Sequence, residues 1–158
     1  MANTAFPNHQ EAKILNSTLR GATTGTAFVV TGGATLYLAL LTNSTNDSTF
    51  AEVASGAGYT SRPAFTATSS QCFQKTSSTG EADAATPSLS NINPITFTAS
   101  GTISGIVGIA ICTSATLSGT ITSDTSVLYY GDLTGGSVTL TAGQSITFAA
   151  NAITVTLD

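Results

Sequence analysis

The chain contains the stretch Thr35-Leu36-Tyr37-Leu38-Ala39-Leu40, which decides the fold class. Its three leucines recur at every second position, so they point to one side of a strand while Thr35, Tyr37 and Ala39 point to the other. That alternation is typical of a sheet with one buried face. We therefore expect this stretch to be a core strand of a β-rich domain.

The second half of the chain consists of short runs of β-forming residues separated by Gly and Asn. Regularly spaced short strands of this kind indicate an antiparallel sandwich or barrel-like fold. The second run has apolar residues on both faces and should be central, and the last two should form a hairpin that turns at Ala150-Asn151. The expected strands are Ile95–Ala99, Gly105–Ser114, Ser126–Leu133, Ser137–Thr141, Ser145–Ala149 and Ile153–Leu157.

The first half of the chain begins with a predicted helix at residues 8–20. Asn8 can cap it, Glu11 can complete a capping box, and Gly21 supplies a stop signal. Its apolar residues recur at helical spacing, so the short helix should lie against the rest of the fold. We expect a single domain over residues 1–158, mainly β with this short N-terminal helix.

The stretch between the core strand and the second half gives weaker signals. Residues 43–58, rich in Asn, Ser and Gly, indicate a long connection. A strand is expected at residues 59–68, and Pro63 predicts that it lies at a sheet edge or is bulged. Residues 69–93 are polar and without periodicity, so we expect an extended excursion from the core, ordered by a neighbouring subunit.

Charged residues make up only 8% of the chain, and the net charge is −4. The four basic residues, Lys13, Arg20, Arg62 and Lys75, are scattered, whereas nucleic-acid binding needs clustered Lys and Arg. Neither an apolar run of membrane-spanning length nor a signal peptide is found. We expect no nucleic-acid and no membrane partner, synthesis in the cytoplasm, and interfaces that survive molar salt because few ion pairs can form.

Candidate catalytic residues are few. His9 lies in the first turn of the predicted helix with no nucleophile motif beside it. The carboxylate pairs Glu81 with Asp83 and Asp124 with Asp132 could serve as a glycosidase acid and nucleophile, but each is assigned to a turn or polar loop, where a solvated surface charge is the default. We therefore predict no catalytic residue and no enzyme activity.

Other residue clusters favour structure over ligand binding. Cys72 and Cys112 have no metal-ligand spacing, so buried reduced thiols are favoured over a disulfide. The glycine pair at 135–136 is followed by no Lys and helix, and indicates a turn. Three tyrosines could line a sugar platform, although packing is favoured. They are Tyr59, Tyr129 and Tyr130. We predict no cofactor and no metal site.

The order of several sequence blocks resembles a family of short proteins encoded in the structural-gene modules of tailed phages, labelled as head decoration or tail fibre components. The likeness spans nearly the whole chain. Its blocks are Glu11–Leu15, Leu19–Gly21, Thr35–Thr42, Glu52-Val53, Gly56–Arg62, Ile95–Phe97, Gly105–Ile109, Leu128–Leu133 and Ala142–Asp158.

This resemblance implies a virion protein located at the capsid surface or the tail. Our first expectation is a capsid decoration or cement protein that binds the major capsid protein or other virion proteins as a homo-oligomer, a trimer at three-fold lattice positions. The alternative is a tail fibre or adhesin component that meets host-surface glycans through a Tyr-lined surface.

Overall fold

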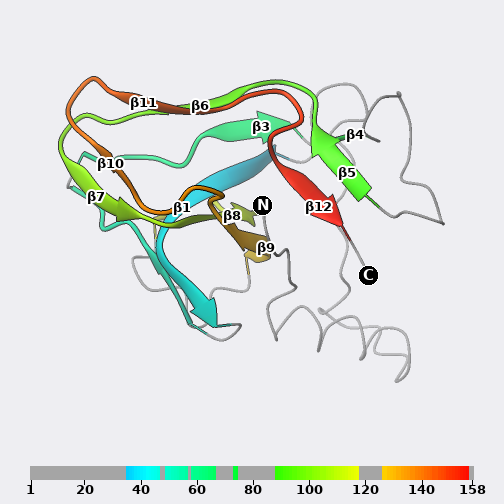
Figure 1. The fold of residues 1–158 in the computed structure, drawn as a ribbon, viewed down its shortest axis with the longest axis horizontal. Helices are drawn as coiled ribbons and strands as arrows, with labels where there is room; N and C mark the ends of the chain where they lie inside the picture. Colours follow the sequence, from blue (N-terminus) through cyan, green and yellow to red (C-terminus); the bar gives the residue numbers. More distant parts are fainter. Residues whose placement is uncertain are drawn as a thin grey trace.

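β1, Thr35–Asn46, is the strand around which the fold is built. The computed structural model describes residues 35–46, 49–56, 58–66, 73–74, 88–117 and 126–156. These residues form twelve strands, all paired antiparallel, and no helix (Figure 1). The expected mainly β, antiparallel fold is confirmed, while the predicted helix at residues 8–20 lies outside the described residues.

A five-stranded sheet forms on both sides of β1. On one side β1 pairs with β8, Gly108–Cys112, which pairs in turn with β9, Val127–Asp132. On the other side it pairs with β2, Thr49–Glu52, and with the short edge strand β3, Ala64–Thr66. β8 is thus central, as its apolar residues predicted, and all five of its residues are buried.

Three smaller sheets accompany this one, and Figure 1 shows β6 and β11 in a layer apart from β1 and β8. Two of them are two-stranded ribbons, each made by strands far apart in the sequence. The ribbons are β6, Ile95–Thr98, with β11, Ser145–Phe148, and β7, Ile103–Ile106, with β10, Val138–Leu140. In the third sheet β5, Ser88–Asn91, lies between β4, Phe73–Gln74, and β12, Thr154–Thr156.

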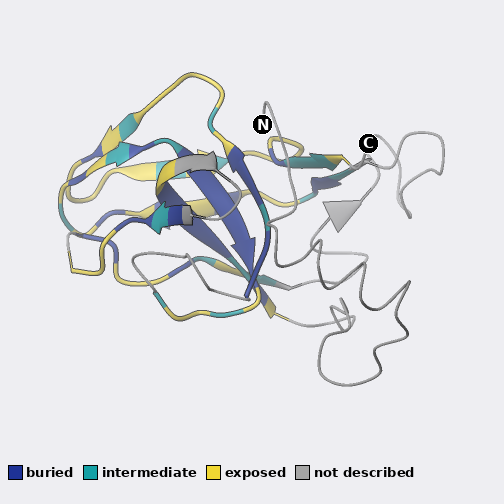
Figure 2. Ribbon diagram, turned by 90° about the horizontal axis from the view of Figure 1, so that it is seen from below, coloured by how far each residue is buried: buried dark blue, intermediate teal, exposed yellow. Residues whose placement is uncertain are grey.

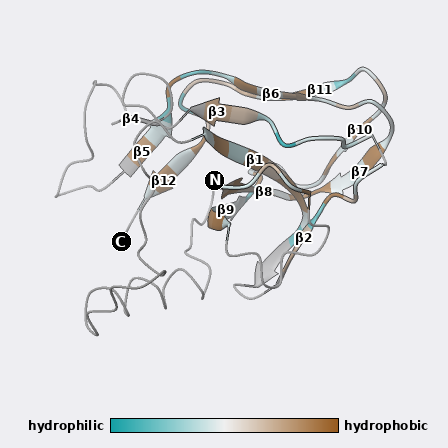
Figure 3. Ribbon diagram, turned by 180° about the vertical axis from the view of Figure 1, so that it is seen from behind, coloured by the Kyte–Doolittle hydropathy of each residue, from teal (hydrophilic) through white to brown (hydrophobic). Residues whose placement is uncertain are grey.

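The main core lies between the large sheet and the two ribbons. Leu36, Leu38 and Leu40 point into it from β1, as predicted, and meet Phe97 and Ile106 from the ribbons. Hydrophobic residues are accordingly concentrated on β1, β8 and β9, and the strands in the middle of the molecule are buried (Figures 2 and 3). The core strand is therefore where the leucine alternation placed it.

The prediction that β1 has one buried face was wrong. Ala39 and Leu41, on the opposite face, are also fully buried. They belong to a second apolar cluster that includes Phe50 and Tyr130, whose ring centroids lie 4.4 Å apart. β1 is thus buried on both faces, which is the environment of a central strand.

Several strand boundaries also differ from expectation. Residues 43–58 are not one long connection, because β1 runs on to Asn46 and β2 pairs back onto it. In the described part of the expected strand at 59–68, residues 59–66, the three residues of β3 form a strand, at an edge as Pro63 predicted. The expected excursion at 69–93 contains β4 and β5. The expected strand at 105–114 is broken at Val107, whose amide bonds Leu41 and whose carbonyl bonds Leu133.

The predicted C-terminal hairpin was wrong in its pairing, although its turn exists. Asn151 has a φ of 63°, and Ala152 N donates to Ala149 O across the turn. β11 and β12 do not pair with each other: β11 pairs with β6 and β12 pairs with β5. The turn between them is bonded to Asn91 of β5. Asn91 Nδ2 donates to Ala149 O at 2.9 Å, and its Oδ1 accepts from Ile153 N at 2.8 Å.

Candidate functional site

A buried polar network joins β2 to the loop before β3. The Arg62 guanidinium donates from Nε to Glu52 Oε1 at 2.7 Å and from Nη2 to Oε2 at 2.8 Å. Its Nη1 donates to Ser114 O at 2.6 Å. The Tyr59 hydroxyl donates to Glu52 Oε1 at 2.9 Å and accepts from Leu40 N at 3.2 Å. One network therefore connects β1, β2, the loop and the end of β8.

The surroundings of Tyr59 and Arg62 in this network raise the pKa of both groups. Burial raises the pKa of Tyr59 above its usual value, and the charge of Glu52 raises it further. Burial disfavours the charged form of Arg62, but its hydrogen bonds to Glu52 and the nearby negative charges outweigh this, so the pKa of Arg62 is also raised. The tyrosine stays neutral and the arginine charged at physiological pH, which is the behaviour of a structural clamp.

Gly58 lets the loop between β2 and β3 pack closely against a neighbouring turn. Its φ is +87°, and a Cβ at this position would collide with the main chain of Gly101. Ser100 N also donates to Gly58 O at 3.0 Å. Only glycine combines this backbone conformation with so close an approach. The loop is thus fixed at both ends, by Arg62 and by Gly58.

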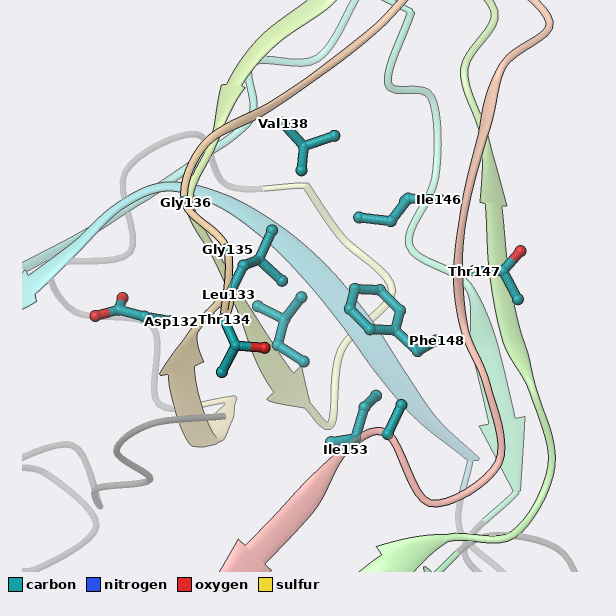
Figure 4. Close-up of a pocket in the computed structure, with 12 residues that line it drawn as sticks. Asp132, Leu133, Thr134, Gly135, Gly136, Val138, Ile146, Thr147, Phe148 and Ile153 are labelled. Atoms are coloured by element: carbon teal, nitrogen blue, oxygen red, sulfur yellow. The ribbon is translucent and has the colours of Figure 1, made fainter.

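A pocket of about 290 Å³ opens between β11 and the connection that follows β9 (Figure 4). Its walls are mostly aliphatic, with one aromatic ring. In Figure 4, Ile146 and Phe148 point into it, while Thr147 and Asp132 point away. The lining residues are Ile109, Asp132, Leu133, Thr134, Gly135, Gly136, Val138, Ile146, Thr147, Phe148, Ala152 and Ile153. Because few polar groups converge on it, the pocket suits an apolar side chain better than a polar ligand.

The β6 and β11 ribbon beside this pocket carries hydroxyl groups in place of charge, whereas the exposed Asp132 lines the pocket from β9. Thr96 and Thr147 hydroxyls lie 3.0 Å apart across β6 and β11, and those of Thr98 and Ser145 lie 2.8 Å apart. All four side chains are exposed. In the described part of the chain, three residues are Asp, Glu, Lys or Arg, namely Glu52, Arg62 and Asp132, and the first two are buried.

The tyrosines and Cys112 are in structural positions. Tyr59 is fully buried and packs edge-on against Phe97, with ring centroids 5.2 Å apart, while Tyr130 is 8% exposed. Tyr129 is half-buried. Packing is thus confirmed for Tyr59 and Tyr130, and they offer no sugar platform. Cys112 is buried in β8.

The carboxylate pairs are not brought together within the described residues. Asp132 is exposed at the end of β9, whereas its suggested partner Asp124 lies outside them. His9, Cys72, Glu81 and Asp83 also lie outside. No group of three His, Cys, Asp or Glu side chains that could hold a metal occurs within the described ranges, and no helix there is long and apolar enough to cross a membrane.

Sequence reasoning missed Glu52 and Arg62 as partners and missed the pocket. A signal for the pair exists, because a chain with so few charges places opposite charges ten residues apart, on either side of a glycine-rich turn. The pocket had no such signal, since its residues come from four separated segments.

The fold and this site define a β-rich module whose buried polar groups hold its own loops in place. In the part of the chain that the structure describes, its surface is nearly uncharged. A family model described as podophage GP4 fiber I protein gp80 matches residues 5–156, and the chain belongs to this family. It is therefore a structural protein of a tailed-phage virion. No curated protein matches the chain.

Proposed function

We propose that this chain is a subunit of a tailed-phage fibre, which acts through assembly and not through catalysis. The single observation that carries the proposal is the match of almost the entire chain to a fibre protein family. The fibre was the alternative role expected from the sequence. The decoration or cement role on the shell stays a prediction.

The structure supports an assembly role in two ways. The ionisable groups of the Glu52 and Arg62 pair are buried and bonded to one another, so they do not face a substrate. The surface of the β6 and β11 ribbon offers hydroxyls and main chain, which bind a neighbouring protein without charge. We propose that the module forms a homo-oligomer, a trimer in our expectation, and contacts other virion proteins.

Labelling of intact virions tests the location. Antibodies raised against the purified chain, coupled to gold and viewed by electron microscopy, should decorate a fibre. Labelling spread over the shell would reject the fibre role and favour a decoration protein. Virions of a phage with the gene deleted serve as the control for antibody specificity.

A further inference from the structure

The strand β11 has an open main-chain edge. Its register pairs Thr147 with Thr96 and Ser145 with Thr98. The next pair along is hydrogen-bonded, since Ala99 N donates to Gln144 O at 2.9 Å. Bonded and non-bonded pairs alternate along an antiparallel ladder. The N–H and C=O groups of Ser145 and Thr147 therefore point away from β6.

The side chains give the same assignment. Residues of a non-bonded pair lie closer together than those of a bonded pair. The two pairs assigned as non-bonded are the ones whose hydroxyl groups meet across the strands, at 3.0 Å between Thr96 and Thr147 and at 2.8 Å between Thr98 and Ser145. Within the described residues, β11 pairs with β6 alone, and no other main-chain bond reaches Ser145 or Thr147.

The pocket lies along this same edge. Thr147 lines the pocket although its side chain points away, so its main chain forms that part of the wall (Figure 4). A strand added beside β11 would place side chains next to Ile146 and Phe148, on the face that looks into the pocket. A cavity of about 150 Å³ holds a benzene ring, so 290 Å³ has room for one or two apolar side chains.

This edge lacks the usual protection. Soluble proteins shield edge strands with Lys, Pro, inward charges or bulges. From Ser145 to Phe148, β11 has no charged residue, no Pro and an unbroken register with β6. A bulge lies just before the strand, where Gly143 and Gln144 both bond Ala99, and the charged residue that lines the pocket is Asp132 of β9. The partner that fits this edge and its pocket is an extended, uncharged segment with apolar side chains.

The chain itself supplies such segments. Residues 133–157 contain no charged residue and are rich in Thr, Val, Ile and Leu, and they include β11 itself and β12, which lies at the end of its sheet. Within the described residues the exposed charge is Asp132 alone, so the described part of the surface presents little charge to a second copy. We propose that the β11 edge and its pocket bind an extended segment of a second copy of this chain by β-augmentation. This inference rests on the proposed role as an oligomeric fibre subunit.

Thr147→Pro tests the edge without disturbing the β6 ladder. The substitution removes an outward N–H, and proline is accepted at edge positions whose N–H faces solvent. Thr96→Pro is the matched control, because it removes the outward N–H of the cross-strand partner on the opposite edge. Light scattering behind size exclusion should show Thr147→Pro self-associating about tenfold or more weakly, the equivalent of one or two lost hydrogen bonds. Thr96→Pro should match the wild type.

Hydrogen exchange on the wild type gives a second measurement. The amides of Ser145 and Thr147 should be protected in the oligomer and exchange rapidly at dilutions where the protein is monomeric, while the amide of Ile146 stays protected in both. If Thr147→Pro does not fold, as judged by circular dichroism, Thr147→Lys replaces it, with Thr96→Lys as its control.

Three outcomes would overturn the inference: a monomeric wild type at all concentrations, oligomers unaffected by both Thr147 variants, or dissociation by the Thr96 variants alone. Gold labelling of the fibre is independent of each of them, so a failure of this inference is distinguishable from a failure of the proposed function.

Discussion

Arg62 donates two hydrogen bonds to the Glu52 carboxylate, at 2.7 and 2.8 Å, and both side chains are fully buried. Removing two charges from water costs free energy, which is recovered only with good geometry and additional hydrogen bonds. Tyr59 and Ser114 O provide those bonds. The pair thus specifies where the loop before β3 lies.

Arg62→Met should destabilise the protein by about 3–5 kcal/mol, because it leaves the Glu52 carboxylate buried without a counter-charge. Urea unfolding followed by circular dichroism measures the loss. The double variant Glu52→Leu with Arg62→Met should cost much less than the sum of the two single variants, since neither charge then remains buried. Additive losses would show that the two residues act independently.

Stability should fall at alkaline pH because of Tyr59. Its pKa is raised in the folded state, first by burial and then by the charge of Glu52. A folded-state pKa above the unfolded value of about 10 means that the native state holds its proton longer, so stability is lost as pH rises above about 10. Unfolding free energies measured between pH 8 and pH 11 should show this decline.

Tyr59→Phe should flatten that decline and cost about 1–3 kcal/mol at neutral pH, because Leu40 N and Glu52 each lose a hydrogen-bond partner. Tyr129→Phe is the necessary comparison, since burial raises the pKa of Tyr129 as well. If Tyr129→Phe removes the whole alkaline decline and Tyr59→Phe none of it, the assignment to Tyr59 is wrong.

Gly58 and Gly56 provide a matched pair of substitutions. Both have a positive φ, at +87° and +98°, but a Cβ at 56 meets open space whereas one at 58 collides with the main chain of Gly101. Gly56→Ala should cost about 1–2 kcal/mol from backbone strain alone. Gly58→Ala should cost clearly more, measured by thermal unfolding. Equal losses would mean that strain, and not the contact with Gly101, explains the glycine.

The sequence predicted local patterns better than pairings. The leucine alternation at 36, 38 and 40 and the doubly apolar run in β8 located the centre of the large sheet, because apolar residues at strand spacing mark a buried face. The alternation did not predict that the opposite face of β1 is buried as well. The partners of β11 and β12 were missed. Neighbouring strands favour a hairpin by default, and the bonds from Asn91 that hold the turn come from about 60 residues away in sequence.

The site was less predictable than the fold. The block from Glu52 to Arg62 carried a family resemblance, but its two opposite charges, ten residues apart, were not interpreted as a pair, and in the structure Arg62 turns inward to the β2 carboxylate. In the sequence Arg62 is one of four scattered basic residues, with no pattern that predicts its burial. Burial of an ion pair depends on three-dimensional packing around it, which periodicity does not report.

Asn91→Asp should detach the turn after β11. Asn91 Nδ2 donates to Asn93 O and Ala149 O, both at 2.9 Å, and a carboxylate would place negative charge against these two carbonyl oxygens. The side chain is 1% exposed, so we expect a loss of about 2–5 kcal/mol, measured by urea unfolding. Thr102→Asp, which adds the same charge at an exposed position, should change stability little. A small effect of Asn91→Asp would contradict the role assigned to Asn91.

Oligomer contacts and attachment to the virion should survive molar sodium chloride and yield to urea. Charge interactions are screened beyond about 8 Å at physiological ionic strength and about 3 Å at 1 M, whereas main-chain bonds and apolar burial are not. In the described residues Asp132 is the exposed charge, and Arg62 is excluded as an anchor because it is buried against Glu52. Virions washed in rising salt, and separately in rising urea, are assayed for release of the chain by immunoblot, with its mass measured by light scattering. Release by salt alone would refute an uncharged interface and direct attention to Arg20 and Lys75, which lie outside the described residues.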